Sequence, residues 1–183
     1  RMWKYECKEI IKLPNSGPSC VIGAPWSDAE TKAVLWGDSH ADHFAPLFAK
    51  GAERLKISIV VGPRSCPPFL NEKNVYYQQK GREHFTDVCT TKQVAMTDWV
   101  LKHKEVKFVI FAAAWTGYLN LLSEPGINHP QSGEKARDLM AAGMADLVGK
   151  LRQGGKHLLI LGDVPRPSIN LNPCAARALS GLF

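Results

Sequence analysis

The stretch AVLWGDSHADHFAPLF, residues 33–48, decides how this chain folds. Its first half is a short apolar run that stops at Gly37, which is typical of a buried strand. Its second half carries apolar side chains at helical spacing and predicts a helix over about 41–52. A buried strand that turns at a glycine into a helix is the opening unit of an α/β fold.

The same order of elements recurs along the chain. Further strands are predicted in three apolar runs, at 56–62 (KISIVVG), 106–115 (VKFVIFAAAW) and 157–164 (HLLILGDV). Helices are predicted at 91–104, 134–152 and 174–183, and a long irregular stretch at about 63–90. Because the strands are continuously apolar and alternate with helices, we expect an α/β three-layer sandwich with a central parallel sheet.

Length and composition fit a single globular domain. The chain has 183 residues, of which 45% are hydrophobic and 22% charged, so we expect one domain over 1–183. Within it we separate an N-terminal segment, 1–32, from an α/β core, 33–183. The longest apolar runs are far shorter than the ~20 residues of a membrane span. The opening RMWKYECKE lacks the apolar stretch of a signal peptide.

The charge of the chain limits its partners. The formal net charge is +6, and the basic residues are scattered without the interleaved aromatic residues that bind single strands. We therefore expect no nucleic-acid partner. An anionic polysaccharide or a lipid headgroup surface is compatible with this charge.

The five cysteines, Cys7, Cys20, Cys66, Cys89 and Cys174, indicate a compartment rather than a metal. No C-x-x-C pair and no zinc-like Cys/His spacing is present, so we expect no metal and no other cofactor. Cys7/Cys20 and Cys66/Cys89 each bracket a loop-like stretch, where disulfides form in oxidising compartments. The alternative is five reduced, buried thiols. With two pairs formed, Cys174 is left over, which suggests a partner beyond the end of this chain.

Three segments of the predicted sheet arrive at one edge. They are GDSH (37–40), GPRSCPP (62–68) and AAAWTGY (112–118), and each follows a predicted strand. In parallel sheets, ligands bind outside the carboxyl ends of the strands. This convergence predicts a functional site there.

Ser39 can be interpreted in two ways from its local sequence. Between a strand end and a helix start, its hydroxyl is exposed and its N–H can bind an oxyanion, as a serine nucleophile requires. Alternatively, Ser39 or Asp38 is only the N-cap of an ordinary helix. We expect the acids Asp38 and Asp163 to be structural, bonded to nearby backbone N–H groups.

The residues around GDSH resemble a known family. VLWGDSHADHFAPLF (34–48) is similar to the first block of the SGNH (GDSL-like) hydrolases. GDSH is the form of that block in the branch fused to membrane-bound acyltransferase-three proteins, which O-acetylate bacterial surface polysaccharides. The resemblance continues along nearly the whole chain, through CVIG (20–23), SCPPF (65–69), AAAWTGY (112–118) and VPRPSINLNPCAARAL (164–179).

The resemblance implies roles for particular residues. Ser39 matches the nucleophile, and its backbone N–H an oxyanion donor. Gly62 is the nearest match to the oxyanion-hole glycine of the second block, with the Ser65 backbone as a rival. Trp115 or Thr116 occupies the place of the third-block asparagine, although Trp115 also fits an ordinary aromatic of the core or rim.

The fourth block of the family, D-x-x-H, supplies the base and the acid that orients it. This chain contains no such block, so the resemblance implies that a last strand, the base and the acid lie beyond Phe183. His43, four residues after Ser39 and on the same helix face, is the best internal substitute for the base. We expect His40 to shape the turn.

The function implied by the resemblance is acyl transfer through a serine acyl-enzyme. The partners would be an acyl donor and a surface glycan acceptor such as lipopolysaccharide O-antigen, and the domain would be tethered to a membrane acyltransferase domain preceding residue 1. The domain would then lie at the periplasmic face of the bacterial inner membrane. The alternatives are a carbohydrate acetyl esterase and a non-catalytic glycan-binding module. The oligomeric state is not predicted.

Overall fold

The computed structural model describes residues 5–71, 76–77, 81 and 84–163. The six-stranded sheet comprises β1 (Glu9–Leu13), β2 (Gly17–Gly23), β3 (Thr31–Gly37), β4 (Ile57–Val61), β6 (Val106–Ala112) and β8 (His157–Ile160). The helices are α1 (Ser39–Arg54), α2 (Phe85–Lys102), α3 (Trp115–Tyr118) and α4 (Gly133–Gln153). A small ribbon pairs β5 (Tyr76–Tyr77) with β7 (Leu122–Ser123). No helix within the described ranges is long and apolar enough to cross a membrane.

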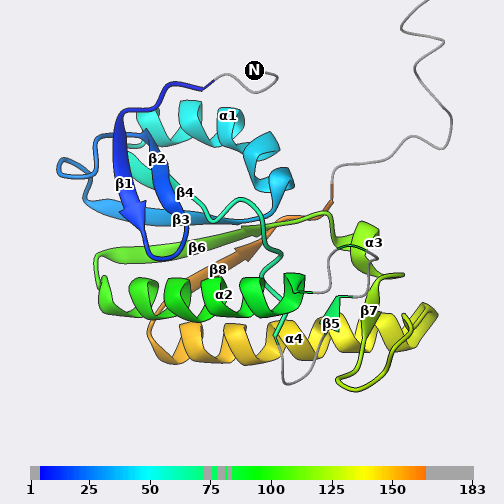
Figure 1. Ribbon diagram of the computed structural model, residues 1–183. Coiled ribbons are helices and arrows are strands. Elements are labelled where there is room, and N and C mark those ends of the chain that lie inside the picture. Colours follow the sequence, from blue (N-terminus) through cyan, green and yellow to red (C-terminus); the bar gives the residue numbers. More distant parts are fainter. Residues whose placement is uncertain (1–4, 72–75, 78–80, 82–83, 164–183) are drawn as a thin grey trace, which may run out of the picture.

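The expected α/β sandwich is confirmed. The strand order is β1-β2-β4-β3-β6-β8, and β4, β3, β6 and β8 run parallel. Figure 1 shows α1 on one face of this sheet and α2 and α4 on the other. Alternate residues of β3 face the two layers: Val34 and Trp36 pack on the α2 and α4 side, and Ala33 and Leu35 on the α1 side.

The sheet is mostly parallel, with an antiparallel addition at one edge. The segment 1–32 contributes the hairpin of β1 and β2, and β2 runs antiparallel to β4. The hairpin turns through Asn15 and Gly17, which have φ angles of 53° and 72°. Asparagine and glycine tolerate this left-handed conformation, so the turn can close tightly and bring β1 back along β2.

Helix α2 begins earlier than its pattern predicts, at Phe85 rather than at 91. Two threonines, Thr86 and Thr97, are buried among its inward-facing residues, so the apolar stripe is broken. The extra turns also carry Cys89 to the core. The periodicity of apolar residues therefore underestimates a helix that buries hydroxyl groups.

Both expected disulfides are present. Cys7 bonds to Cys20 and Cys66 bonds to Cys89, with Cα atoms 5.4 and 5.3 Å apart. The first joins the start of the chain to β2, and the second joins the loop after β4 to α2. Cys174, like the predicted helix 174–183, lies outside the described residues.

The α1 face of the sheet is only partly covered. A hollow of about 440 Å³ lies beside α1 and over the strands, lined by apolar side chains that include Leu47, Leu55, Phe108 and Leu159. Within the part of the chain that the structure describes, β8 pairs with β6 alone. Its other edge and its Leu159 and Ile160 side chains are therefore exposed.

Gly37 ends β3 where the chain passes close to β6. A Cβ atom at Gly37 would collide with the carbonyl oxygen of Ala112, which is backbone and cannot move aside. Glycine at this position therefore lets the turn at 37–40 and the end of β6 meet.

We predict that Gly37→Ala lowers the free energy of unfolding by about 3 kcal/mol, because the added methyl forces two central strands apart. Gly51→Ala is the matched control, since Gly51 lies inside α1 with no atom near its Cβ position. That variant should be neutral or more stable by about 0.5–1 kcal/mol. Urea unfolding of the two variants checks this; equal losses would contradict the explanation.

Candidate functional site

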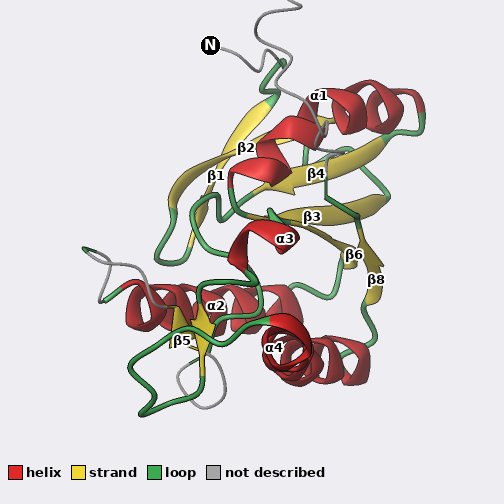
Figure 2. Cartoon of the chain, turned by 90° about the vertical axis from the view of Figure 1, so that its right-hand side faces the viewer, coloured by secondary structure: helices red, strands yellow, loops and turns green. Residues whose placement is uncertain are grey.

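The three predicted segments do meet at the carboxyl edge of the sheet, and a fourth joins them. Figure 2 views the molecule from this edge, where α3 and the start of α1 lie. Asp38 binds the backbone of Ala114, which connects the first segment to the third. The fourth segment follows β8: Leu161 accepts a hydrogen bond from Trp115, and Asp163 contacts His40.

Ser39 is the first residue of α1, and its side chain is exposed. The N-cap of the helix is Asp38, whose carboxylate accepts the N–H of His40 at 2.8 Å. The capping role therefore belongs to the acid. Ser39 lies in the first turn, where backbone N–H groups have no partner within the helix and where the helix dipole favours negative charge.

The carboxylate of Asp38 is buried and accepts three hydrogen bonds. Besides the His40 N–H, it accepts the N–H of Ala114 at 3.0 Å and the hydroxyl of Tyr118 at 2.8 Å. The expected local backbone bond is present, but two of the three donors come from α3 and the residue before it. Asp38 thus joins the turn at 37–40 to the end of β6.

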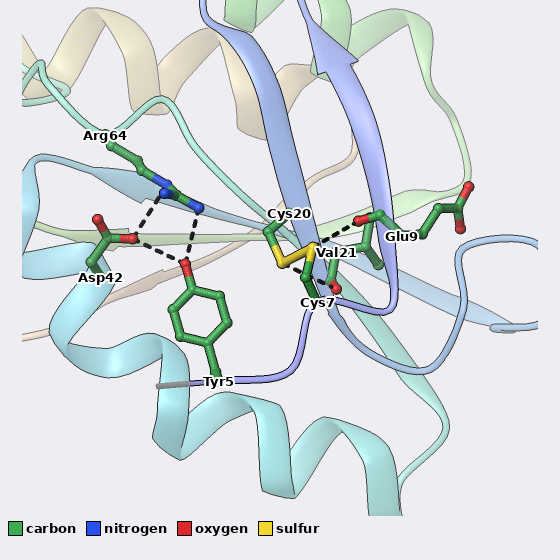
Figure 3. The surroundings of a disulfide bond; sticks show 7 residues. All are labelled: Tyr5, Cys7, Glu9, Cys20, Val21, Asp42 and Arg64. Atoms are coloured by element: carbon green, nitrogen blue, oxygen red, sulfur yellow. Dashed lines mark hydrogen bonds and ion pairs between the residues drawn. A yellow bond between two sulfur atoms is a disulfide. The ribbon is translucent and has the colours of Figure 1, made fainter. Parts of the chain in front are cut away.

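Asp42, one turn along α1, points away from this cluster. Its carboxylate pairs with Arg64, Nε to Oδ1 at 3.3 Å, and also accepts the hydroxyl of Tyr5 at 3.3 Å. Arg64 in turn donates to the Tyr5 hydroxyl at 2.9 Å. Figure 3 shows the Arg64 side chain contacting both Asp42 and Tyr5. This group therefore holds the segment before β1 against the first turns of α1.

His40 and Asp163 form the second contact of the site. The Nδ1 atom of His40 lies 2.8 Å from Oδ1 of Asp163, at an angle too oblique for an aligned hydrogen bond. Thr116 donates its hydroxyl to the other carboxylate oxygen at 2.8 Å. Besides the nearby backbone bonds expected for Asp163, its carboxylate contacts side chains from two distant segments.

His43 packs against His40. The two rings are stacked, with centroids 4.8 Å apart and planes inclined by 24°. His43 is half-buried, and its place on α1, four residues after Ser39, puts both residues on one helix face. It stays the internal candidate for a base.

Gly62 ends the ladder between β3 and β4. Its N–H donates to the carbonyl oxygen of Leu35 at 2.9 Å. A Cβ atom here would meet the hydroxyl of Ser19 at 2.9 Å, on the hairpin side of the sheet. Because this N–H is already bonded in the sheet, we do not assign Gly62 as an oxyanion donor. Ser65, the rival position, is exposed, and its hydroxyl accepts a hydrogen bond from Lys92 at 3.0 Å.

Trp115 connects α3 to the end of β8. Its indole N–H donates to the carbonyl oxygen of Leu161 at 2.7 Å, and its ring lies beside Phe69 with centroids 6.1 Å apart. The indole has only this one donor, so it has none left for a substrate oxygen. The contacts of Trp115 therefore fit a rim aromatic. Thr116 is the residue of this segment whose side chain contacts Asp163.

A hollow lies next to this group of residues. A largely apolar hollow of about 310 Å³ lies beside α3 and α4, with Trp115 and Thr116 in its wall. No group of three or more His, Cys, Asp or Glu side chains that could hold a metal ion occurs among the described residues.

The contact of Tyr118 with Asp38 and the bridging role of Asp163 were not predicted from the sequence. The signal for Asp163 was available, because the carboxyl ends of parallel strands meet at one edge and GD (162–163) ends a strand as GD (37–38) does. Tyr118 had no such signal, since its hydroxyl reaches Asp38 only through the short helix α3.

We predict that Asp38→Asn lowers the free energy of unfolding by about 2–3 kcal/mol, because the amide loses charge-assisted bonds and turns a donor toward another donor. Asp42→Asn is the matched control on the same helix. Its partner Arg64 is 45% exposed, so the loss should stay below about 1 kcal/mol. Thermal and urea unfolding compare the two, and a larger loss for Asp42→Asn would refute this ranking.

Comparison with known proteins gives one match. A family model described as "SGNH domain (fused to AT3 domains)" matches residues 6–183. No curated protein matches the chain, and neither does any solved structure. The match spans the whole described part of the chain from Glu6 onward, including both disulfides' loops and the nucleophile turn.

Proposed function

Because the chain belongs to the family of SGNH domains that are fused to AT3 domains, we propose that it transfers acyl groups through a serine acyl-enzyme. The family supports an acyltransferase or esterase role. The observation that supports a serine acyl-enzyme is the placement of Ser39. It is exposed at the first position of α1, and Asp38 rather than Ser39 caps the helix.

The chemistry proceeds in two steps. A base removes the proton of the Ser39 hydroxyl, and Oγ attacks the carbonyl carbon of the acyl donor. The tetrahedral oxyanion accepts hydrogen bonds from backbone N–H groups at the start of α1, that of Ser39 among them. Its collapse expels the leaving group of the donor, which takes the proton from the base. An acceptor hydroxyl then attacks the serine ester, and Ser39 is released with its proton restored.

The base is proposed to be the histidine of a D-x-x-H block after Phe183, with His43 as the internal substitute. His43 lies on the helix face of Ser39, but its ring is stacked on His40, and neighbouring Asp42 is engaged by Arg64 and Tyr5. Asp42 therefore does not supply the acid that would orient His43.

The acceptor is proposed to be a hydroxyl of a bacterial surface glycan, such as lipopolysaccharide O-antigen. The AT3 membrane domain precedes residue 1 in this proposal and delivers the acyl group at the periplasmic face of the inner membrane. Two disulfides suit that oxidising compartment, and the net charge of +6 suits an anionic polysaccharide.

Ester hydrolysis is the second candidate, because exposed Ser39 leaves its acyl ester open to water. An acetyl esterase and an acyltransferase share every step up to the acyl-enzyme and differ only in the acceptor.

We predict that a fluorophosphonate probe labels Ser39 covalently in the full-length protein. Labelling should be lost in Ser39→Ala and kept in Ser27→Ala, an exposed serine in the loop after β2. Mass spectrometry of the labelled peptide identifies the site. An unlabelled full-length protein, or equal labelling of Ser39→Ala, would refute both enzymatic candidates and favour the glycan-binding module.

To distinguish acyl transfer from hydrolysis, the fate of the acetyl group can be followed. We predict that acetyl from a radiolabelled donor appears mainly on the glycan and only slightly as free acetate. The full-length protein in membranes, with and without purified O-antigen, provides the measurement, and Ser39→Ala sets the background. Release of free acetate at an unchanged rate whether or not glycan is present would instead assign an esterase.

A further inference from the structure

We propose that Asp163 is a positioning residue that fixes the nucleophile turn through His40. This inference rests on the proposed role of Ser39 as the nucleophile. It assigns a function to an acid that reaches the site from the end of β8, two strands away from β3 in the sheet.

Ser39 itself is exposed, so its direction depends on its two neighbours. On one side, Asp38 is buried and holds Ala114 and Tyr118. On the other side, the backbone N–H of His40 is bonded to Asp38, and its ring lies against Asp163. The peptide groups on both sides of Ser39 are thereby tied to the scaffold.

The carboxylate of Asp163 is suited to hold a ring in one orientation. It retains only 11% of its exposure, and the His40 side chain retains 17%. Thr116 donates to Oδ2, and Oδ1 lies 2.8 Å from Nδ1 of His40. A carboxylate beside Nδ1 favours the ring form with its proton on that nitrogen. Stacking on His43 fixes the other face of the ring.

This arrangement joins three segments at one carboxylate. Asp163 follows β8, Thr116 belongs to α3, and His40 belongs to the first turn of α1. Loss of the carboxylate would free the ring and let the turn adopt other directions. Since a misplacement of about 1 Å at a reacting atom can cost about 10²-fold in rate, the effect should fall on the rate and spare binding.

The test is the kinetics of fluorophosphonate acylation in the full-length protein. We expect Asp163→Asn to lower the saturating rate constant about 10- to 100-fold, with the half-saturating probe concentration changed less than about twofold. Thr116→Val, which leaves the carboxylate in place without its orienting bond, should give a smaller loss. Asp146→Asn, an exposed acid on α4 paired with Lys150, is the matched control and should behave as the parent protein.

Two further variants separate positioning from other roles. His40→Gln should lower the rate as Asp163→Asn does, and the double variant should show no additional loss, because both act through one contact. Abolition of labelling by His40→Gln, to the level of Ser39→Ala, would make His40 the base and overturn the assignment. An unchanged rate constant in Asp163→Asn, or a raised half-saturating concentration alone, would also overturn it.

A spectroscopic measurement keeps this inference distinct from the proposed function. In solid-state ¹⁵N spectra of the histidine-labelled full-length protein, the signal missing from His40→Gln identifies His40. Its Nδ1 should appear protonated, and Asp163→Asn should shift that signal, whereas Asp146→Asn should not. If the parent protein is not labelled by the probe, the nucleophile proposal fails. A shifted His40 signal in Asp163→Asn would then still support the role of Asp163 in holding the turn. An unchanged signal would overturn that role.

Discussion

The buried carboxylate of Asp38 is the interaction on which the site depends. An ionised carboxylate is only tolerated inside a protein when hydrogen bonds replace its water, and Asp38 receives three. Those donors come from α1 and from the segment after β6, so satisfying one charge fixes the distance between two strand ends. Gly37 permits the same approach by presenting no side chain to Ala112. Electrostatics and sterics thus impose one geometry on the turn.

The architecture was largely predictable because its core strands are continuously apolar. Residues such as Val34 and Trp36 face one layer and Ala33 and Leu35 the other, and only a sheet covered on both sides buries all four. The hairpin of β1 and β2 was not predicted, because Glu9, Ile10 and Lys12 are solvent-facing or at an edge and give no long apolar run. Its signal was the turn at Asn15 and Gly17.

The location of the site was predictable from the sequence, but the chemical roles of its residues were predictable only in part. Strand direction brings GDSH, the loop after β4 and α3 together, so the convergence follows from topology alone. Which atoms are available does not follow. The Gly62 N–H and the Trp115 indole could serve an oxyanion by residue type, yet carbonyl oxygens of Leu35 and Leu161 already accept them. Side-chain contacts between distant segments, such as Asp163 with His40, depend on loop paths that local patterns do not encode.

The one-sided pairing of β8 bears on how this domain behaves in solution. Among the described residues no strand pairs with its outer edge, and the apolar side chains of Leu159 and Ile160 are exposed beside it. Such an edge is a template for another strand. The tendency of the domain to self-associate therefore depends on what covers the outer edge of β8. The part of the chain described here, held alone at high concentration, would associate through this edge, and its net positive charge would be the main force opposing that association.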